Sequence, residues 1–261
     1  MAKRKGAGDI QTRHDERRKK RIREQKMRRI AFFSFLALVA VLIVMFFTPL
    51  FNIKNVEIAG NNRISNEEIT STVGEIEGRN LFSYRKGKIK NRLYKLAYVE
   101  KVSVKKKAFP PTIRIDIKEC IPAFQAEYAG GFAVVNKSGK VLEQAGEKIE
   151  GVPTMQGVLI SSAKEGDTVA FKDAEAQKII MSCIENMEKA GIISDITVMS
   201  FEDMTNITFN YQNRLDVICG THIDFQRKLA LFKEAVNSNK LTENSRGTIN
   251  LSTTGKAIYT P

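Results

Sequence analysis

The sequence is poor in the residues that build metal centres and disulfide frameworks. Its 261 residues include two histidines and three cysteines. Only His222 follows the N-terminal apolar run, and no histidines and cysteines cluster at metal-ligand spacing, which argues against a transition-metal site. Cys120, Cys183 and Cys219 are odd in number and sparse, which argues against a disulfide framework, although a bridge between one pair stays open. Cys183 and Cys219 fall on predicted apolar elements and are expected as small core residues.

Motifs of common enzymes are also lacking. No G-x-S-x-G nucleophile elbow occurs, and the S-x-x-K spacing of Ser161 and Lys164 stands without S-D-N and K-T-G partners. His222 stands just before the predicted helix cap Asp224 and is interpreted as a loop residue rather than a general base. A Ser-Lys dyad from other positions stays open, since both residue types are abundant. We expect no catalysis, no cofactor and no small-molecule substrate.

Positive charge is concentrated at the N-terminus. Residues 1–29 hold thirteen Lys and Arg against four Asp and Glu, whereas the rest holds 29 against 25. This distribution argues against nucleic acid as a partner, because a nucleic-acid module carries its charge on a folded face. We predict a disordered cytoplasmic tail over residues 1–29 that lies against anionic lipid, with a cytoplasmic partner site as the alternative. The basic residues assigned to topology are Arg17, Arg18, Lys19, Lys20, Arg21, Arg28 and Arg29.

Residues 30–47 form an apolar run of eighteen positions with no charge and one hydroxyl, Ser34. At about 1.5 Å per residue, such a helix reaches about 27 Å, close to the ~30 Å hydrocarbon core of a membrane. Pro49 is expected to end the helix, so residues 30–50 are predicted as one transmembrane signal anchor. The residues assigned to the anchor are Ile30, Phe32, Phe33, Leu36, Leu38, Val39, Val41, Leu42, Ile43, Val44, Phe46 and Phe47.

The same basic residues predict the orientation of the anchor, because Lys and Arg stay on the cytoplasmic side. The N-terminus is then cytoplasmic, and the bulk of the chain is exported. A cleaved secretory signal is one alternative, but such signals have a 7–15-residue apolar core and a small-residue cleavage site, which residues 47–51 do not offer. A buried helix of a soluble protein is the other alternative.

Residues 51–122 read as a β-α-α-β-β unit. A strand over Phe51–Ala59 is followed by a turn and a short helix, in which Ser65 and Glu68 form a capping box. A second helix is marked by an apolar stripe at Ile89, Leu93, Leu96 and Ala97. Two strands follow, one with Val102 and Val104 and one with Ile113, Ile115 and Ile117 alternating with polar residues, so one face of the sheet is expected to be buried.

Residues 123–261 are predicted as a mixed, β-rich domain with two amphipathic helices. A hairpin covers 132–142, helices begin at Asp173 and Asp224, and strands are expected at 196–201, 207–211, 215–219, 248–251 and 257–259. The fold class is therefore α+β, with a single N-terminal transmembrane helix. Within the β-α-α-β-β unit, the run Lys105-Lys106-Lys107 is interpreted as a solvated strand end, with a site for acidic wall polymer or a partner as the alternative.

The order of these elements resembles the bacterial cell division family FtsQ, called DivIB in Gram-positive bacteria, whose first exterior unit is a POTRA domain. The resemblance extends over essentially the whole chain. The stretches that carry it are 51–61, 64–69, 78–82, 111–119 and 134–142 with the C-terminal 249–251 and 255–258. Asn136 stands where the family often has an acid, and Ser252 stands where it commonly has Arg, which weakens any transfer of partner contacts.

The resemblance implies a non-enzymatic scaffold at the division septum. Its β domain is expected to engage FtsL and DivIC (FtsB) type partners and to assist septal peptidoglycan synthases. An edge strand offers unpaired backbone groups to a partner strand, and Lys256, Ala257, Ile258 and Tyr259 are the candidate edge, with a plain core strand as the alternative. Tyr259 is the expected anchor, since aromatic side chains are favoured there.

A POTRA-bearing component of protein export is the rival function, because POTRA domains also receive unfolded chains. Such systems usually combine several POTRA units with a membrane barrel, whereas this chain has one unit and no series of alternating strands long enough for a barrel. A wall-active enzyme is a third, minor possibility. The division scaffold is therefore the preferred hypothesis.

Overall fold

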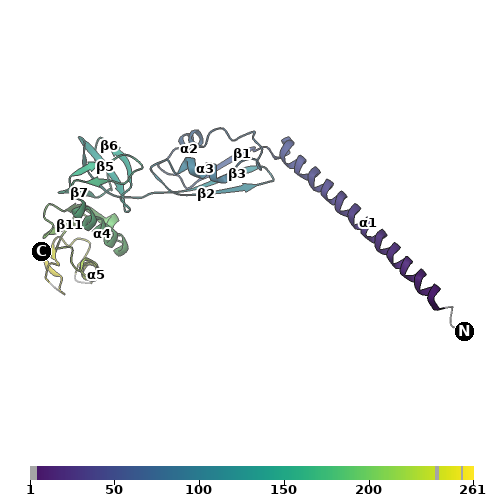
Figure 1. Ribbon diagram of the computed structural model, residues 1–261. Coiled ribbons are helices and arrows are strands. Elements are labelled where there is room, and N and C mark those ends of the chain that lie inside the picture. The colour runs from purple at the N-terminus through teal and green to yellow at the C-terminus, as the bar shows by residue number, and fades with distance from the viewer. Residues whose placement is uncertain (1–4, 239–240, 254) are drawn as a thin grey trace. The chain divides into compact units, whose positions relative to one another are not determined.

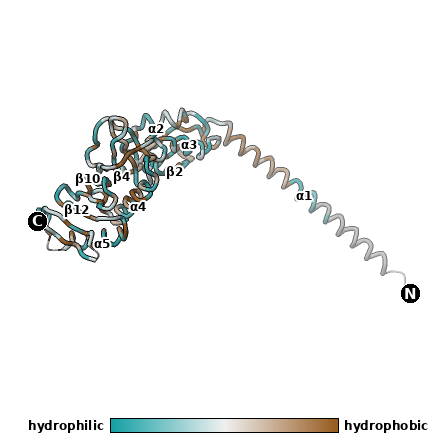
Figure 2. The backbone as a smooth tube through the Cα atoms, turned by 60° about the vertical axis from the view of Figure 1, so that its left-hand side comes forward, coloured by the Kyte–Doolittle hydropathy of each residue, from teal (hydrophilic) through white to brown (hydrophobic). Residues whose placement is uncertain are grey.

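The computed structural model describes residues 5–238, 241–253 and 255–261, and its first element is the long helix α1 (Lys5–Phe47) (Figure 1). Residues Arg23–Phe46 of α1 are long and apolar enough to cross a membrane and bury none of their apolar stretch against the rest of the protein. This apolar part is the brown portion of α1 in Figure 2. The helix ends two residues before Pro49, as expected, and the short 3-10 helix η1 (Pro49–Phe51) follows.

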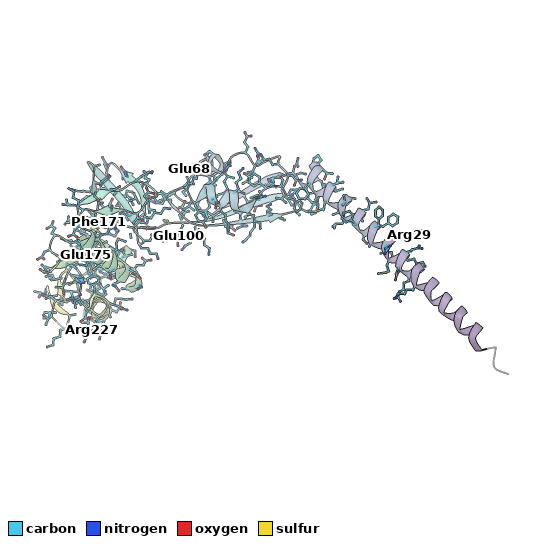
Figure 3. All side chains as sticks on the ribbon, viewed as in Figure 1. Arg29, Glu68, Glu100, Phe171, Glu175 and Arg227 are labelled. Carbon is cyan, nitrogen blue, oxygen red and sulfur yellow. The ribbon has the colours of Figure 1, made fainter. Side chains whose placement is uncertain are left out.

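The prediction of a disordered tail is wrong for the part of it that the structure describes. From Lys5 onward the basic residues continue the same helix as the apolar run. Lys, Arg, Gln and Glu are good helix formers, and a helix that is already nucleated extends through them at little cost. Lys20, Arg28 and Arg29 are exposed on α1, where Figure 3 labels Arg29. The side chains of Arg17, Arg18, Lys19, Arg21 and Phe47 lie outside the described residues.

A small three-stranded sheet with two helices follows α1. Its elements are β1 (Asn55–Ala59), α2 (Asn66–Val73), α3 (Lys86–Leu93), β2 (Val99–Lys107) and β3 (Thr112–Glu119), with strand order β1-β3-β2. Ser65 caps α2 by accepting a hydrogen bond from the Glu68 amide at 3.1 Å, as the capping box predicts. α3 ends at Leu93, so Leu96 and Ala97 lie in the turn after it. Ile113, Ile115 and Ile117 are buried as expected, but Thr112 is buried with them.

Gly60 and Glu119 lie in two of the stretches that resemble the family, and their contacts show why these residues are needed at the turn after β1. Gly60 has φ of +84°, and a Cβ there would lie 2.1 Å from the carbonyl oxygen of Ile117, so no larger residue fits. The Glu119 carboxylate accepts hydrogen bonds from the amides of Asn62, Arg63 and Ile64 at 2.9–3.1 Å. β3 therefore holds the turn after β1 from both sides.

The chain packs as two compact units. The first contains the described part of the chain up to Glu57 together with Glu75–Lys88 and Val104–Arg114. The second contains Ile58–Gly74, Ile89–Ser103 and Ile115–Pro261. The second unit holds the complete larger sheet, which carries the candidate site.

The larger sheet has nine strands in the order β14-β13-β12-β11-β10-β7-β4-β5-β6. The strands are β4 (Pro122–Tyr128), β5 (Gly131–Asn136), β6 (Val141–Ala145), β7 (Thr154–Gln156), β10 (Ile196–Ser200), β11 (Ile207–Tyr211), β12 (Leu215–Gly220), β13 (Gly247–Asn250) and β14 (Ile258–Thr260). β7 is parallel to both β4 and β10, and β12 is parallel to β13; the other neighbours are antiparallel. β4 and β7 were not predicted, and β6 continues into the expected loop.

Helices α4 (Ala174–Ala190) and α5 (Phe225–Val236) pack against each other and share one core with the sheet, and Figure 1 shows them beside β11. Asp173 caps α4 as expected, accepting hydrogen bonds from the amides of Glu175 and Ala176. The expectation for Asp224 is half right. It stands at the N-cap position of α5, but with φ of 55° its side chain makes no cap hydrogen bond. A two-stranded sheet of β8 (Ile160–Ser162) and β9 (Ala170–Phe171) completes the unit.

The three cysteines are buried as free thiols, so the open possibility of a disulfide is not realised. Cys183 and Cys219 belong to the main core, as predicted. Burial raises the pKa of both thiols to about 12, which keeps them protonated and unreactive at neutral pH. Cys120 lies in a smaller apolar cluster with Val134 and Leu142.

Candidate partner-binding edge

The last strand of the chain is also the last strand of the large sheet. β14 pairs antiparallel with β13, with Ile258 opposite Asn250, Tyr259 opposite Ile249 and Thr260 opposite Thr248. All three β14 residues are exposed, Ile258 at 48% and Tyr259 at 37%. Of the four predicted edge residues, Ile258 and Tyr259 lie in the strand, whereas Lys256 and Ala257 precede it. The alternative of a plain core strand does not fit this exposure.

The first residues after β13 are fixed to the sheet and start the turn that leads toward β14. The amide of Leu251 donates to the carbonyl of Ile218 at 2.8 Å, and the Leu251 side chain is buried. The Asn250 side-chain oxygen then accepts from the amide and hydroxyl of Ser252 at 2.9 and 2.7 Å, which starts the turn. At the other end of the pair, a Cβ on Gly247 would lie 2.2 Å from the Thr260 carbonyl oxygen, so glycine permits the close approach of β14.

A shallow hollow of about 370 Å³ opens beside β14. Its lining residues are Leu231, Glu234, Ala235, Ser238, Leu241, Ala257 and Tyr259. The Tyr259 hydroxyl donates to the Arg246 carbonyl at 2.7 Å, which fixes the ring at the rim. Leu231, Ala235, Leu241, Ala257 and the ring of Tyr259 make the lining of this hollow mainly apolar. Sequence reasoning found Tyr259 but missed Leu231 and Leu241, because the buried stripe of α5 accounts for Phe225, Leu229 and Phe232 alone.

The opposite sheet end, β6, is closed by the chain itself. The amide of Val141 donates to the Asp167 carbonyl, and the Gly166 amide donates to the Val141 carbonyl, each at 2.9 Å. The Gln144 side-chain amide donates to the Ala163 carbonyl at 2.7 Å. Val141 and Leu142 are fully buried. β14 is therefore the end of the sheet that is accessible to a further strand.

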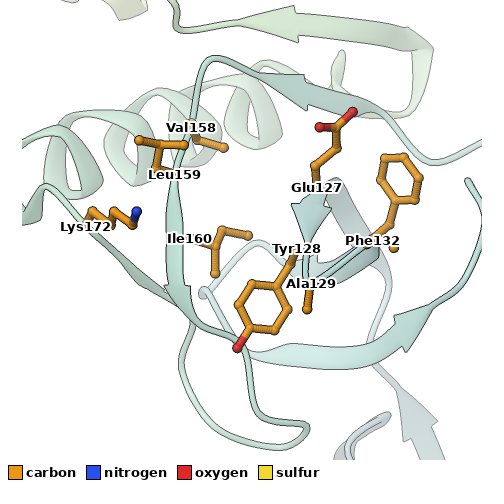
Figure 4. Close-up of a pocket in the computed structure, with 10 residues that line it drawn as sticks. Glu127, Tyr128, Ala129, Phe132, Val158, Leu159, Ile160 and Lys172 are labelled. Carbon is orange, nitrogen blue, oxygen red and sulfur yellow. The ribbon is translucent and has the colours of Figure 1, made fainter.

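A second hollow of about 620 Å³ lies at the tip of the β4–β5 hairpin, next to the segment before β8 (Figure 4). Figure 4 shows Tyr128 and Phe132 on the hairpin side and Val158, Leu159 and Ile160 on the other. Lys172 and Glu127 supply one charge of each sign. Its lining mixes apolar side chains with polar groups, and none of the residues considered for catalysis lines it.

The residues considered for catalysis do not form a catalytic group. The Ser161 hydroxyl donates to the Ala170 carbonyl at 3.0 Å, while the exposed Lys164 ammonium lies 3.7 Å from the Asp167 carboxylate. His222 is exposed in the loop before α5, as interpreted from the sequence. Within the described ranges, no three His, Cys, Asp or Glu residues gather as metal ligands would. The geometry offers a sheet edge with an apolar hollow beside it and a second, mixed hollow at the β4–β5 hairpin.

In order along the described chain, the fold consists of an N-terminal apolar helix of membrane-spanning length, a small β-α-α-β-β unit and a larger mixed domain. Residues 51–119 match the domain family described as POTRA domain, FtsQ-type. The cell division protein FtsQ of Corynebacterium glutamicum is 31% identical over 185 residues, which cover 70% of this chain and 78% of the relative. The cell division proteins DivIB of Clostridium tetani and Clostridium botulinum strain Hall are each 26% identical, covering 87% and 93% of this chain and 85% and 93% of the relatives.

The chain belongs to the FtsQ/DivIB family of bacterial cell division proteins. The expected family and fold class are thereby confirmed. Among the described residues, the one helix of membrane-spanning length fits a membrane-anchored protein of the division septum.

Proposed function

We propose that the protein is a non-catalytic, single-pass scaffold of the division machinery that holds its partners by β-strand addition at β14. The observation that carries this proposal is the exposed terminal strand β14 beside an apolar hollow, in a sheet whose other end is closed. A partner segment would pair its backbone with Ile258–Thr260 and place one apolar side chain against Tyr259 and Leu241. Binding would then depend on main-chain hydrogen bonds for affinity and on the hollow for specificity.

The partners we infer are FtsL and DivIC (FtsB) type division proteins, with septal peptidoglycan synthases joining the same assembly. The basic residues before the apolar helix favour a cytoplasmic N-terminus lying against anionic lipid. The larger domain would then lie outside the cell. Each bound partner raises the effective concentration of the next one at the septum, so assembly needs no catalysis.

A photocrosslinking amino acid at Ile258 in the full-length chain tests the edge in living cells. The expected result is a crosslink to an FtsL or DivIC type protein, because that side chain lies on the exposed strand. The matched control is the same probe at Ile121, which is 80% exposed and lies before β4, remote in the sheet order from β14. Equal crosslinking from both positions would contradict strand addition at β14.

A fluorescent fusion at the N-terminus tests the wider role. We expect a midcell ring that fades when residues 255–261 are removed. A ring that persists would keep the division role and move the recruitment contact away from β14. Uniform membrane fluorescence of a functional full-length fusion would contradict the division scaffold and favour the export component.

A further inference from the structure

Four phenylalanines gather where the chain leaves the apolar helix. Phe46 lies in the last turn of α1, Phe51 lies in η1, Phe82 lies before α3 and Phe109 lies in the turn between β2 and β3. The ring centroids are 6.4 Å apart for Phe46 and Phe82, 5.1 Å for Phe51 and Phe82, and 5.5 Å for Phe51 and Phe109. This phenylalanine cluster is not a core, because Phe109 is 65% exposed and Phe46 is 45% exposed. Leu50, which precedes Phe51 in η1, is also exposed, at 56%.

Hydrogen bonds hold the cluster at the end of the helix. The Asn80 side-chain amide donates to the Met45 carbonyl at 2.7 Å, one of the carbonyls that a helix end leaves without an intrahelical partner. The Asn80 side-chain oxygen accepts from the Phe82 amide at 2.9 Å. The amide of Leu81 donates to the Phe51 carbonyl at 2.9 Å. Asn80 is thus tied to the last turn of α1 and Leu81 to η1, which holds the Phe82 ring beside that of Phe46.

Lys106 ties β2 to the same segment. Its ammonium group donates to the Leu81 carbonyl at 2.6 Å and to the Tyr84 carbonyl. Burial lowers the pKa of Lys106, and the nearby Lys86 lowers it further. The interpretation of 105–107 as a solvated strand end is therefore wrong for Lys106, which has a structural role. Because β2 leads directly into the turn of Phe109, this contact also helps to fix the ring of Phe109 beside Phe51.

Basic residues outnumber acidic ones in the segments that carry the cluster. The first unit beyond α1, residues 48–57, 75–88 and 104–114, holds nine Lys and Arg against three Glu. Arg79, Arg85 and Lys107 are exposed and lie within a few residues of Asn80, Phe82 and Phe109 respectively. Exposed aromatic rings and basic side chains together are the composition of surfaces that lie in the interface of a membrane.

We propose that the phenylalanine cluster and its basic neighbours form a membrane-apposed surface that binds an anionic phospholipid leaflet. Phe109, Phe82 and Leu50 enter the headgroup boundary, while Arg79, Arg85 and Lys107 bind lipid phosphates. Continuity with the membrane-spanning helix identifies the occupant, since Phe46 belongs to both. The function of this surface is to fix the tilt of the first unit on the membrane. The inference depends on α1 crossing the membrane and is independent of partner binding at β14.

The chain contains no tryptophan, so a single introduced indole reports its own depth in the membrane. Phe109→Trp in the full-length protein is placed in vesicles of phosphatidylcholine and phosphatidylglycerol that carry bromine on the acyl chains near the headgroups. Leu50→Trp is a second probe of the same surface, should the first variant fold poorly. The control is Leu159→Trp, because Leu159 is 67% exposed, like Phe109, but lies in the second unit.

We expect bromine to quench Phe109→Trp and Leu50→Trp about threefold more strongly than Leu159→Trp, since interfacial rings lie at headgroup level. Adding Arg85→Gln and Lys107→Gln should remove most of the gain in quenching that phosphatidylglycerol gives over phosphatidylcholine alone. Quenching of both probes no stronger than that of Leu159→Trp would overturn the proposal. Strong quenching that changes neither with the charge of the lipid nor with the Gln substitutions would overturn the assignment of an anionic lipid.

Discussion

At one end of the nine-stranded sheet, β6 lies beneath other parts of its own chain, whereas β14 at the other end is exposed along its whole length. β6 has backbone bonds to residues 166 and 167, side-chain bonds to the following loop and two fully buried apolar side chains. Unpaired strand edges invite pairing with other chains, and proteins usually cover them. This chain covers one edge and leaves the other accessible, and the accessible edge is the one at which we propose that a partner binds.

At this closed end, residues from earlier in the chain pack against β5 and β6. Cys120, Val134 and Leu142 form an apolar cluster, and Tyr98 packs against it. The Arg63 guanidinium lies over the Tyr98 ring, with its carbon 5.3 Å from the ring centroid, and donates to the Tyr98 hydroxyl at 3.1 Å. Sequence reasoning missed the contacts of Arg63, because Tyr98 and Glu143 are 35 and 80 positions away from it.

The sharpest contrast between the ends is expected in stability. Leu142→Ala should lower the free energy of unfolding by about 2–5 kcal/mol, because it leaves a cavity at a fully buried position. Ile258→Ala, at the 48% exposed β14 position, should change it by less than about 0.5 kcal/mol. Urea unfolding of the full-length protein in detergent, followed by circular dichroism, measures both. Comparable losses from both variants would mean that β14 belongs to the core after all.

Partner binding should show the reverse contrast. Tyr259→Ala is expected to weaken the affinity for an FtsL or DivIC type partner about tenfold or more, or about 1.4 kcal/mol, since an aromatic anchor at an interface centre has effects of this size. Tyr128→Ala, which alters the other hollow of Figure 4, should leave the affinity within about twofold. Titration calorimetry with the reconstituted partner measures both affinities.

Tyr259→Phe separates the two roles of that residue. It keeps the ring at the hollow but removes the hydroxyl that donates to the Arg246 carbonyl. Affinity close to that of the unchanged protein would assign the effect to the ring. An equal loss from Tyr128→Ala would transfer the contact to the hairpin hollow and contradict the β14 site.

Sequence periodicity predicted the strands and helices that carry a simple pattern. The stripe of α4 and the alternation of β3 appear in the structure with their buried faces as expected. β4 was missed because four consecutive buried residues hide its alternation, and Gln125 stands among them. Gln125 is tolerated there because its side chain bonds to Ile149 twice and to the Val152 carbonyl once, at 2.8–2.9 Å. Those partners come from a distant loop that no local pattern reveals.

The candidate site was also predictable from the sequence only in part. That the chain ends in a strand with a tyrosine was predictable from residues 256–259. That this strand is the end of the sheet was not, because β13 reaches its place by parallel pairing with β12, and α5 lies between them in the chain. The hollow beside Tyr259 likewise joins α5 to residues 241 and 257. Its role in binding is a proposal.

The stability of the closed end should depend on pH through Tyr98. Burial raises the pKa of Tyr98 above its ordinary value, and Glu143 raises it further. The folded chain therefore keeps this proton to higher pH than the unfolded chain, and stability should fall as pH rises above about 10. Tyr98→Phe should cost about 1 kcal/mol at neutral pH and make that fall shallower. Urea midpoints at pH 8 and 10.5 measure both effects; an unchanged slope would contradict this role of Tyr98.

The smallest expected effect decides whether charge contributes to closing the β6 end. Arg63 and Glu143 lie 3.3 Å apart, with side chains 42% and 32% exposed. A pair this exposed should couple by about 0.2–1 kcal/mol in a double-mutant cycle of Arg63→Gln and Glu143→Gln, and the coupling should shrink in high salt. Arg63→Lys should recover only part of it, because lysine lacks the planar group that stacks on Tyr98. Coupling indistinguishable from zero would leave the burial of Leu142, the packing of Tyr98 and the hydrogen bonds to residues 163, 166 and 167 as what closes this edge. In that case the contrast with β14 depends on packing and hydrogen bonds, without a contribution from this ion pair.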